Sequence, residues 1–195
     1  MTSTTEETAP NPGLIGLPLI LPGAIGLGAT NTGLVSVAAA AVPVLVSATA
    51  IGLLITTAWS AALRQNVNAT LYGTFFGFYG SYAALSLGLT HNWFGIADAD
   101  IRQTTTLWLA SWLFTIALLT VLLIRLPWIY PAVLAVVDVA LVLLLIGNHS
   151  NNSAATQAGG WLVFVFVVFV IYFYVAAVWE ATGGKALPLG RPLIG

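Results

Sequence analysis

Long apolar runs recur along the whole chain and alternate with short stretches that hold most of its polar and charged residues. Each run is close to the ~20 residues that an α-helix needs to cross the hydrocarbon core of a bilayer. The runs predict six such helices, at residues 13–34, 38–63, 70–90, 102–124, 128–147 and 157–181. The short connections favour antiparallel neighbours. The pattern therefore predicts an all-α polytopic membrane protein with six transmembrane helices.

The two ends of the chain depart from this pattern. Residues 1–10 are polar, include Glu6 and Glu7, and lack the basic start and the small-residue cleavage site of a signal peptide. We expect a disordered cytoplasmic tail at 1–10, a transmembrane domain at 11–183 and a cytoplasmic C-terminal tail at 184–195. Within the last of these, the sequence Leu-Pro-Leu-Gly at 187–190 predicts an ordered turn.

Composition supports a membrane protein. Of the 195 residues, 59% are hydrophobic and 6% are charged, whereas a soluble domain carries about 25% charged residues. The lipid bilayer is therefore the expected partner of most of the surface. The net charge of −1 gives no indication of nucleic-acid binding, and the lack of cysteine excludes disulfides.

The cationic residues predict the orientation. Arg64 and Arg125 end the second and fourth spans, and Lys185 and Arg191 follow the sixth. With six spans, all four positions fall on one side of the membrane, and Arg102 alone falls on the other. The positive-inside rule then places both termini in the cytoplasm.

Helix breakers crowd the first span. Asn11 is a favoured helix N-cap, and Pro12 suits the first helical position. Pro18, Pro22 and several glycines follow among Leu, Ile and Ala. Irregular backbone at membrane depth survives only where protein or a water-filled cavity satisfies its polar groups, so residues 11–30 are expected to line a pathway. The alternative is a kinked helix whose glycines pack closely against its neighbours.

The third span presents two stripes at helical spacing. One is a seam of small residues that lets another helix approach closely: Gly73, Gly77, Gly80, Ala84 and Gly88. The other is largely aromatic and carries three phenolic hydroxyls: Tyr72, Phe75, Tyr79, Tyr82 and Ser86. A phenol in hydrocarbon needs a hydrogen-bond partner. Tyr79, near mid-span, therefore either lines a polar path or is satisfied by packing.

The fifth span contains Asp138, the one charged residue deep within a span. An intramembrane carboxylate is a functional hypothesis by default, here as a carrier of protons. The alternative is a neutral or hydrogen-bonded Asp at a helix or subunit contact. The uncharged polar stretch 147–153 follows, includes Asn148, and forms either a vestibule or an exposed turn.

Two further aromatic features indicate packing. Trp108 and Trp112 lie one turn apart on one face of the fourth span. The sixth span is densely apolar and aromatic, and it is expected to face lipid or another subunit.

Catalytic chemistry is not indicated. The chain shows no nucleophile–base pair, phosphate loop or metal-ligand set, and the spacing of His91, Asp98 and Asp100 matches no ligand pattern. We therefore expect no enzyme, no cofactor and no metal site. Conduction needs only a lined path, a constriction and a few polar groups. One buried acid and exposed helix N–H groups suit a small polar or singly anionic solute that binds weakly.

Several motifs in order along the chain carry a family resemblance. Residues 11–17 resemble the signature Asn-Pro-Ala-Pro-Leu-Gly-Leu, with Gly13, Leu14 and Ile15 as the departures. Further matches run to residue 190: Tyr79-Gly80-Ser81-Tyr82 to Tyr-Gly-Ser-Phe, Ile146-Gly147-Asn148 to Ile-Gly-Asn, Gly159-Gly160-Trp161 to Ala-Gly-Trp, and Glu180 with Leu187 to Gly190 to a C-terminal Glu and Leu-Pro-Ile-Gly. On these motifs the chain resembles the acetate uptake transporter family, the succinate–acetate permeases.

The resemblance implies a fold and a function. It implies six helices per protomer with both termini inside, and a homo-hexamer with one pathway in each subunit. It further implies uptake of acetate and related small monocarboxylates, with succinate as another candidate, across the plasma (inner) membrane. Transport in the family is proton-coupled or channel-like, so protons are a further candidate partner.

The resemblance also implies site residues. The family's constriction is a Phe, a Tyr and a Leu, which match Ile20, Tyr79 and Val137, so two of the three are smaller here. Asn11, at the helix start, would meet the carboxylate near the mouth. Asp138 neighbours Val137, where the family has no known acid, so its place as the candidate proton site follows from its own chemistry and not from the resemblance. The expected substrate pathway comprises Asn11, Pro12, Tyr79, Tyr82 and Asn148.

Two other functions stay open at this point. One is a channel for urea or a short amide in a similar six-helix hexamer. The other is a non-transporting accessory subunit of a membrane complex, because the Gly73/Gly77 seam and the apolar sixth span would serve subunit packing equally well.

Overall fold

The computed structural model describes residues 10–36 and 41–194, and these residues form helices without a β-sheet. The elements are α1 (Gly13–Asn31), α2 (Val42–Ala62), α3 (Asn66–Thr90), the 3-10 helix η1 (Asp98–Asp100), α4 (Ile101–Leu122), α5 (Ile129–Ser150) and α6 (Ser153–Ala181). The predicted all-helical fold with six long helices is confirmed. Residues 1–9 of the predicted disordered tail lie outside the described residues.

The helix ends differ most from the prediction between the last two helices. The stretch 147–153, expected as a loop, is mostly helical, because α5 extends to Ser150 and α6 begins at Ser153. The chain reverses at Asn151, whose φ of 52° is left-handed, a conformation that Asn tolerates better than most residues. Asn152 then caps α6 by accepting a hydrogen bond from the Ala155 N–H at 3.1 Å.

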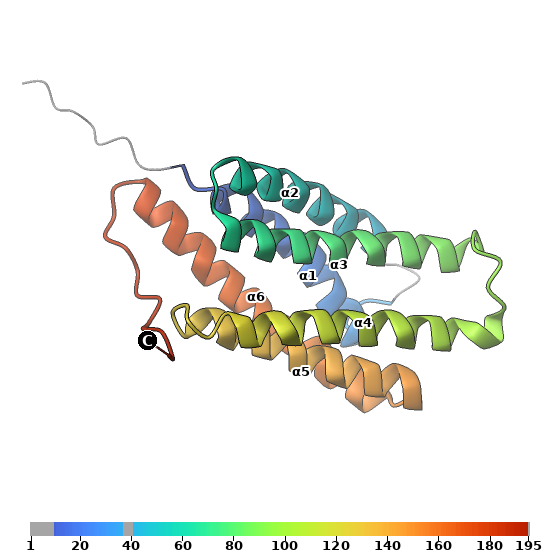
Figure 1. Ribbon diagram of the computed structural model, residues 1–195. Coiled ribbons are helices and arrows are strands. Elements are labelled where there is room, and N and C mark those ends of the chain that lie inside the picture. Colours follow the sequence, from blue (N-terminus) through green and yellow to red (C-terminus); the bar gives the residue numbers. More distant parts are fainter. Residues whose placement is uncertain (1–9, 37–40, 195) are drawn as a thin grey trace, which may run out of the picture.

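Membrane-spanning character is clear for most of the bundle. Within the described residues, five segments are long and apolar enough to cross a bilayer: Gly13–Asn31, Val42–Ala62, Asp98–Leu122, Ile129–Ser150 and Ser153–Ala181. The helix α3 is not among them although it is 25 residues long. Its Asn, Thr, Ser and Gly residues and its three tyrosines lower its hydropathy. Figure 1 shows α3 running lengthwise along the bundle beside the other helices.

The six helices form an incomplete ring. Going round it, α3 packs on α2, α2 on α1, α1 on α6, α6 on α5 and α5 on α4. The first three helices thus form one row and the last three another, joined through α1 and α6 (Figure 1). The backbones of α3 and α4 approach each other much less closely. Side chains close the ring at that point.

The proline-rich helix α1 is continuous, which the sequence did not predict. Pro18 and Pro22 lie inside its 19 residues, and a proline removes one backbone donor from the helix. Next to Pro22, the Gly23 N–H donates to the hydroxyl of Thr49 at 3.0 Å. That hydroxyl donates in turn to the Leu19 carbonyl at 2.6 Å. The Thr49 side chain is therefore inserted into the hydrogen-bond ladder of α1 between Leu19 and Gly23. The expected break in the backbone does not occur.

Glycines let the neighbours of α1 approach this closely. A Cβ at Gly23 would lie 2.6 Å from the Thr49 hydroxyl oxygen and 3.0 Å from the Tyr79 ring. A Cβ at Gly160 of α6 would lie 2.7 Å from the backbone nitrogen of Thr32. The alternative interpretation, in which the glycines of α1 pack closely against neighbouring helices, is therefore confirmed for one face of α1.

The C-terminal segment is docked on the bundle. The Tyr172 hydroxyl donates to the Pro188 carbonyl at 2.7 Å, and the Trp128 N–H donates to the Arg191 carbonyl at 3.0 Å. Gly190 has a φ of +88° and packs beneath the Trp128 ring. Residues 187–190 are thus held against the bundle, but they form an irregular segment and not the predicted turn. Figure 1 shows the segment lying across the end of the bundle where α6 finishes.

We expect Thr49→Val to lower the free energy of unfolding by about 2 kcal/mol, because it leaves the Gly23 N–H and the Leu19 carbonyl buried without a partner. Thermal unfolding of the purified protein in detergent measures the change. Thr49→Ser keeps the hydroxyl and is the matched control, with stability close to that of the wild type. Equal stability of the Val variant and the wild type would contradict the role given to this hydroxyl.

Candidate functional site

Two cavities enter the bundle from its opposite ends. The proximal cavity, of about 540 Å³, opens where α1 begins and reaches the exposed residues Pro10 and Glu180. The distal cavity, of about 550 Å³, opens at the other end and reaches the exposed residues Asp98 and Arg102. Together the two cavities extend through the interior of the ring of helices.

The start of α1 lies at the mouth of the proximal cavity. Pro12 directly precedes α1, and the side-chain oxygen of Asn11 accepts a hydrogen bond from the Gly13 N–H at 2.9 Å. Asn11 thus satisfies the first N–H of the helix, as expected of a residue at the helix start. Its amide nitrogen donates to no residue in the described part of the chain. The Tyr72 hydroxyl is close by, since a Cβ at Gly13 would lie 3.0 Å from it. Pro12 is fully buried and does not line the cavity, so it shapes the helix start only.

The distal cavity contains the other predicted pathway residues. Tyr79, Tyr82, Val137 and Asn148 all line it. The Asn148 amide nitrogen donates to the Arg102 carbonyl at 3.0 Å and to the Thr106 hydroxyl at 2.9 Å. Asn148 therefore ties the end of α5 to the start of α4 and fixes the rim of this cavity.

Four tyrosines line the two cavities, and their hydroxyls have no hydrogen-bond partner among the described residues. Tyr72 and Tyr130 line the proximal cavity, and Tyr79 and Tyr82 line the distal one. None of these four hydroxyls donates a hydrogen bond to a described residue, whereas the hydroxyl of Tyr172, outside the cavities, does. A buried phenol needs a partner, and a cavity can supply one as water or solute. This favours the interpretation that Tyr79 lines a polar path over the alternative that its hydroxyl is hydrogen-bonded within the packed helices.

Aromatic side chains wall the distal cavity where α3 and α4 stand apart. The indole N–H groups of Trp108 and Trp112 both donate to the Ser81 hydroxyl oxygen, each at 3.0 Å. The Phe78 ring lies against both indoles, with centroid distances of 5.0 and 5.7 Å. A Cβ at Gly77 would lie 2.7 Å from Trp112. The predicted packing role of the two tryptophans is confirmed, and the glycine seam accommodates a ring rather than a helix backbone at Gly77.

The two cavities share two residues, Phe75 of α3 and Phe166 of α6. Their rings stack with a centroid distance of 5.8 Å and an interplanar angle of 23°. Of the predicted constriction, Ile20 lines the proximal cavity alone, and Tyr79 and Val137 line the distal cavity alone. The three residues therefore lie on either side of the shared aromatic pair.

Sequence reasoning missed Phe166. The sixth span was expected to face lipid or another subunit, yet Phe166, Val170 and Phe173 line a cavity. Because α6 is apolar on all sides, its sequence contains no amphipathic signal that distinguishes the inner face from the outer one. Phe75 did carry a signal, since it belongs to the stripe that contains Tyr72 and Tyr79.

Asp138 lines neither cavity. It lies at the contact between α5 and α4, where the Thr120 hydroxyl donates to one carboxylate oxygen at 2.7 Å. Its other oxygen is buried and accepts no hydrogen bond from the described residues. The structure therefore brings Asp138 to a helix contact and not to the shared aromatic pair.

The charged residues on the cavity walls are confined to the mouths. Glu180 is exposed at the proximal mouth, and Asp98 and Arg102 are exposed at the distal mouth. All other lining residues are uncharged. The walls thus provide hydroxyls and amides along an otherwise apolar route, with a carboxylate at each entrance and a guanidinium at the distal one.

Comparison with known proteins identifies the family. The chain matches the model of the GPR1/FUN34/yaaH family over residues 2–185. The chain belongs to the GPR1/FUN34/yaaH family. This is the acetate transporter family, so the resemblance in the sequence motifs is confirmed.

A solved structure supports the fold of this GPR1/FUN34/yaaH family member. The structure of the bacterial acetate channel SatP matches with a TM-score of 0.79 at 20% sequence identity. The match covers 93% of this chain and 99% of the SatP chain. A search of curated protein sequences found no match. The protein is therefore a multi-pass membrane protein with the fold of the SatP channel.

We expect Ser81→Ala to lower the free energy of unfolding by about 2 kcal/mol, because it leaves two indole N–H groups without their acceptor. Thermal unfolding in detergent measures the difference. Ser86→Ala is the matched control on the same helix, since the Ser86 hydroxyl only donates to the Ala83 carbonyl of its own helix. Equal effects of the two substitutions would contradict the role of Ser81 in joining α3 to α4.

Proposed function

We propose that the protein conducts acetate and related small monocarboxylates across the plasma (inner) membrane, through a pathway within each protomer. The observation that carries this proposal is the row of tyrosine hydroxyls, without protein partners among the described residues, along two cavities that meet at one aromatic pair. The family and the likeness to the bacterial acetate channel SatP support the choice of solute. Succinate, which the family resemblance also implies, is a further candidate.

The chemistry of the walls suits a weakly bound anion. Acetate is ionised near neutral pH, and an ion in hydrocarbon is strongly disfavoured. The hydroxyls of Tyr72 and Tyr79, together with the Asn11 amide, replace part of its water shell as hydrogen-bond donors. Weak binding and fast exit are what a conducting path requires.

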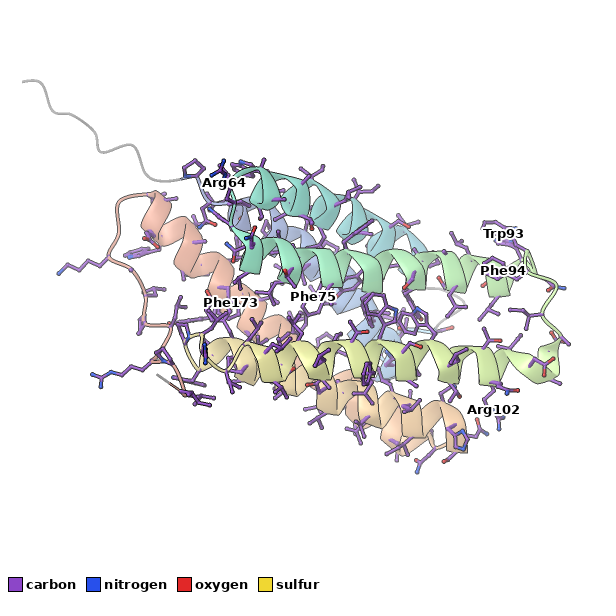
Figure 2. All side chains as sticks on the ribbon, in the orientation of Figure 1. Arg64, Phe75, Trp93, Phe94, Arg102 and Phe173 are labelled. Carbon is purple, nitrogen blue, oxygen red and sulfur yellow. The ribbon has the colours of Figure 1, made fainter. Side chains whose placement is uncertain are left out.

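We propose that the proximal mouth faces the cytoplasm. We also propose that α3 crosses the membrane, which brings the number of spans to six. Arg64 and Arg102 lie at opposite ends of the bundle in Figure 2. Arg191 contacts Trp128, near Arg125, and the C-terminal segment beside it also lines the proximal cavity. The cations are thus concentrated at the proximal end, which the positive-inside rule assigns to the cytoplasm. Both termini then lie inside, and the family resemblance supports a homo-hexamer.

The two competing functions make different predictions for transport. A urea or short-amide channel would also use uncharged donors, so the family and not the charge of the mouths favours an anion. An accessory subunit would not need two cavities that approach each other from opposite ends of one protomer. Measurements of acetate and urea flux by the same preparation discriminate these alternatives.

The test of the proposal is uptake of labelled acetate into proteoliposomes that contain the purified protein. We expect flux well above that of empty liposomes and well above the flux of urea. Accumulation that depends on an inward proton gradient would establish proton coupling, and equilibration without accumulation would establish a channel. An absence of acetate flux with folded, inserted protein would overturn the proposed function.

We expect Tyr79→Phe to reduce acetate flux about fivefold, since a neutral hydrogen bond contributes about 1 kcal/mol and this hydroxyl faces the cavity. The proteoliposome assay measures the change. Tyr174→Phe is the matched control, because Tyr174 lies on α6 and lines neither cavity. Unchanged flux in the folded Tyr79 variant would remove this hydroxyl from the pathway.

We expect Asp138→Asn to leave the rate and the pH profile of acetate uptake unchanged. The reason is that Asp138 lies outside both cavities, and asparagine retains an oxygen that can accept from Thr120. Uptake measured between pH 5 and pH 8 tests this, because burial on a transport path raises the pKa of a carboxyl from about 4 toward that range. A shifted pH profile would instead support Asp138 as the proton site.

A further inference from the structure

We propose that the stacked rings of Phe75 and Phe166 are the gate of the pathway and set the largest carboxylate that passes. This inference rests on the proposed function and names the residues that determine its selectivity. Among the described residues, these two side chains line both cavities, so a solute that moves from one cavity to the other must pass them.

The pair spans the interior of the ring of helices. Phe75 comes from α3 and Phe166 from α6, which are not neighbours in the ring. The two side chains are 7% and 6% exposed, so neither is open to bulk solvent. With ring centroids 5.8 Å apart, the rings are in contact and leave no room for a carboxylate between them. The gate is closed in this conformation.

The flanks of the pair are polar, whereas the pair itself is not. On α3, Tyr72 lies three residues before Phe75 and Tyr79 lies four residues after it, so all three share one face of the helix. Tyr72 lines the proximal cavity and Tyr79 the distal cavity. A tyrosine hydroxyl can therefore donate a hydrogen bond to an anion on either side of the rings, whereas the rings themselves offer no donor. The crossing between the two hydroxyls is the unfavourable step.

The aromatic pair supplies the bulk that the expected constriction lacks. Ile20 and Val137 are both aliphatic and lie on opposite sides of the pair. A phenyl ring between two cavities has space on each side into which it can rotate. Rotation of a side chain is fast compared with helix movement. The rings can thus open a narrow passage without rearrangement of the helices, and the width of that passage limits the solute.

The test compares acetate with butyrate, a longer carboxylate, in proteoliposomes that contain the full chain. We expect the wild type to conduct acetate in strong preference to butyrate. Phe75→Ala and Phe166→Ala should each raise the ratio of butyrate to acetate flux on the order of tenfold, which is the scale on which pockets discriminate methylene groups. Phe169→Ala is the matched control, because Phe169 lies on α6, packs against the core and lines neither cavity.

The possible outcomes distinguish a failure of the gate proposal from a failure of the proposed function. An absence of wild-type acetate flux would overturn the proposed function itself. Wild-type acetate flux with the same flux ratio in the Phe75, Phe166 and Phe169 variants would overturn the gate and leave the function intact. If an alanine variant does not yield a monodisperse protein, Phe75→Leu and Phe166→Leu are tested. They should change the ratio in the same direction by a smaller factor, and an unchanged ratio would again overturn the gate.

Discussion

The insertion of the Thr49 hydroxyl into α1 is the interaction on which the rest of the structure depends. The hydroxyl accepts from the Gly23 N–H and donates to the Leu19 carbonyl, so it fixes α2 to α1 beside Pro22. The α1 helix stays continuous through both of its prolines. Because α1 joins the two rows of helices through α2 and α6, its continuity holds the ring together around the cavities.

The ring is closed by side chains where α3 and α4 diverge. Ser81 accepts two indole N–H groups, and Phe78 fills the space beside them. This arrangement separates the α3 and α4 backbones while it seals the wall between them. The distal cavity owes its volume to that separation, since closely packed helices would leave no room between them. Packing at this position therefore has a direct consequence for the pathway.

The cavities are lined by polar groups on both sides of the Phe75 and Phe166 rings, and the rings themselves are apolar. The Asn11 amide and the hydroxyls of Tyr72 and Tyr79 can replace part of the water around an anion. They bind it less tightly than a buried Lys or Arg would. The apolar rings between them exclude water and resist the passage of charge. In the proposed function, solute affinity and solute selection thus lie with different residues.

Composition and periodicity predicted the class, the six helices, the role of Asn11 at the helix start and the polar stripe of α3, because these are local properties of the chain. Only the tertiary structure decided which faces of the helices meet. The sequence of α6 is apolar all round, so nothing in it placed Phe166 opposite Phe75. In the same way, the sequence predicted that Asp138 lies deep within a span, but it did not predict the contact of Asp138 with Thr120. The reason is physical: hydropathy records how far a residue is from water, whereas a pathway depends on which distant helices face one another.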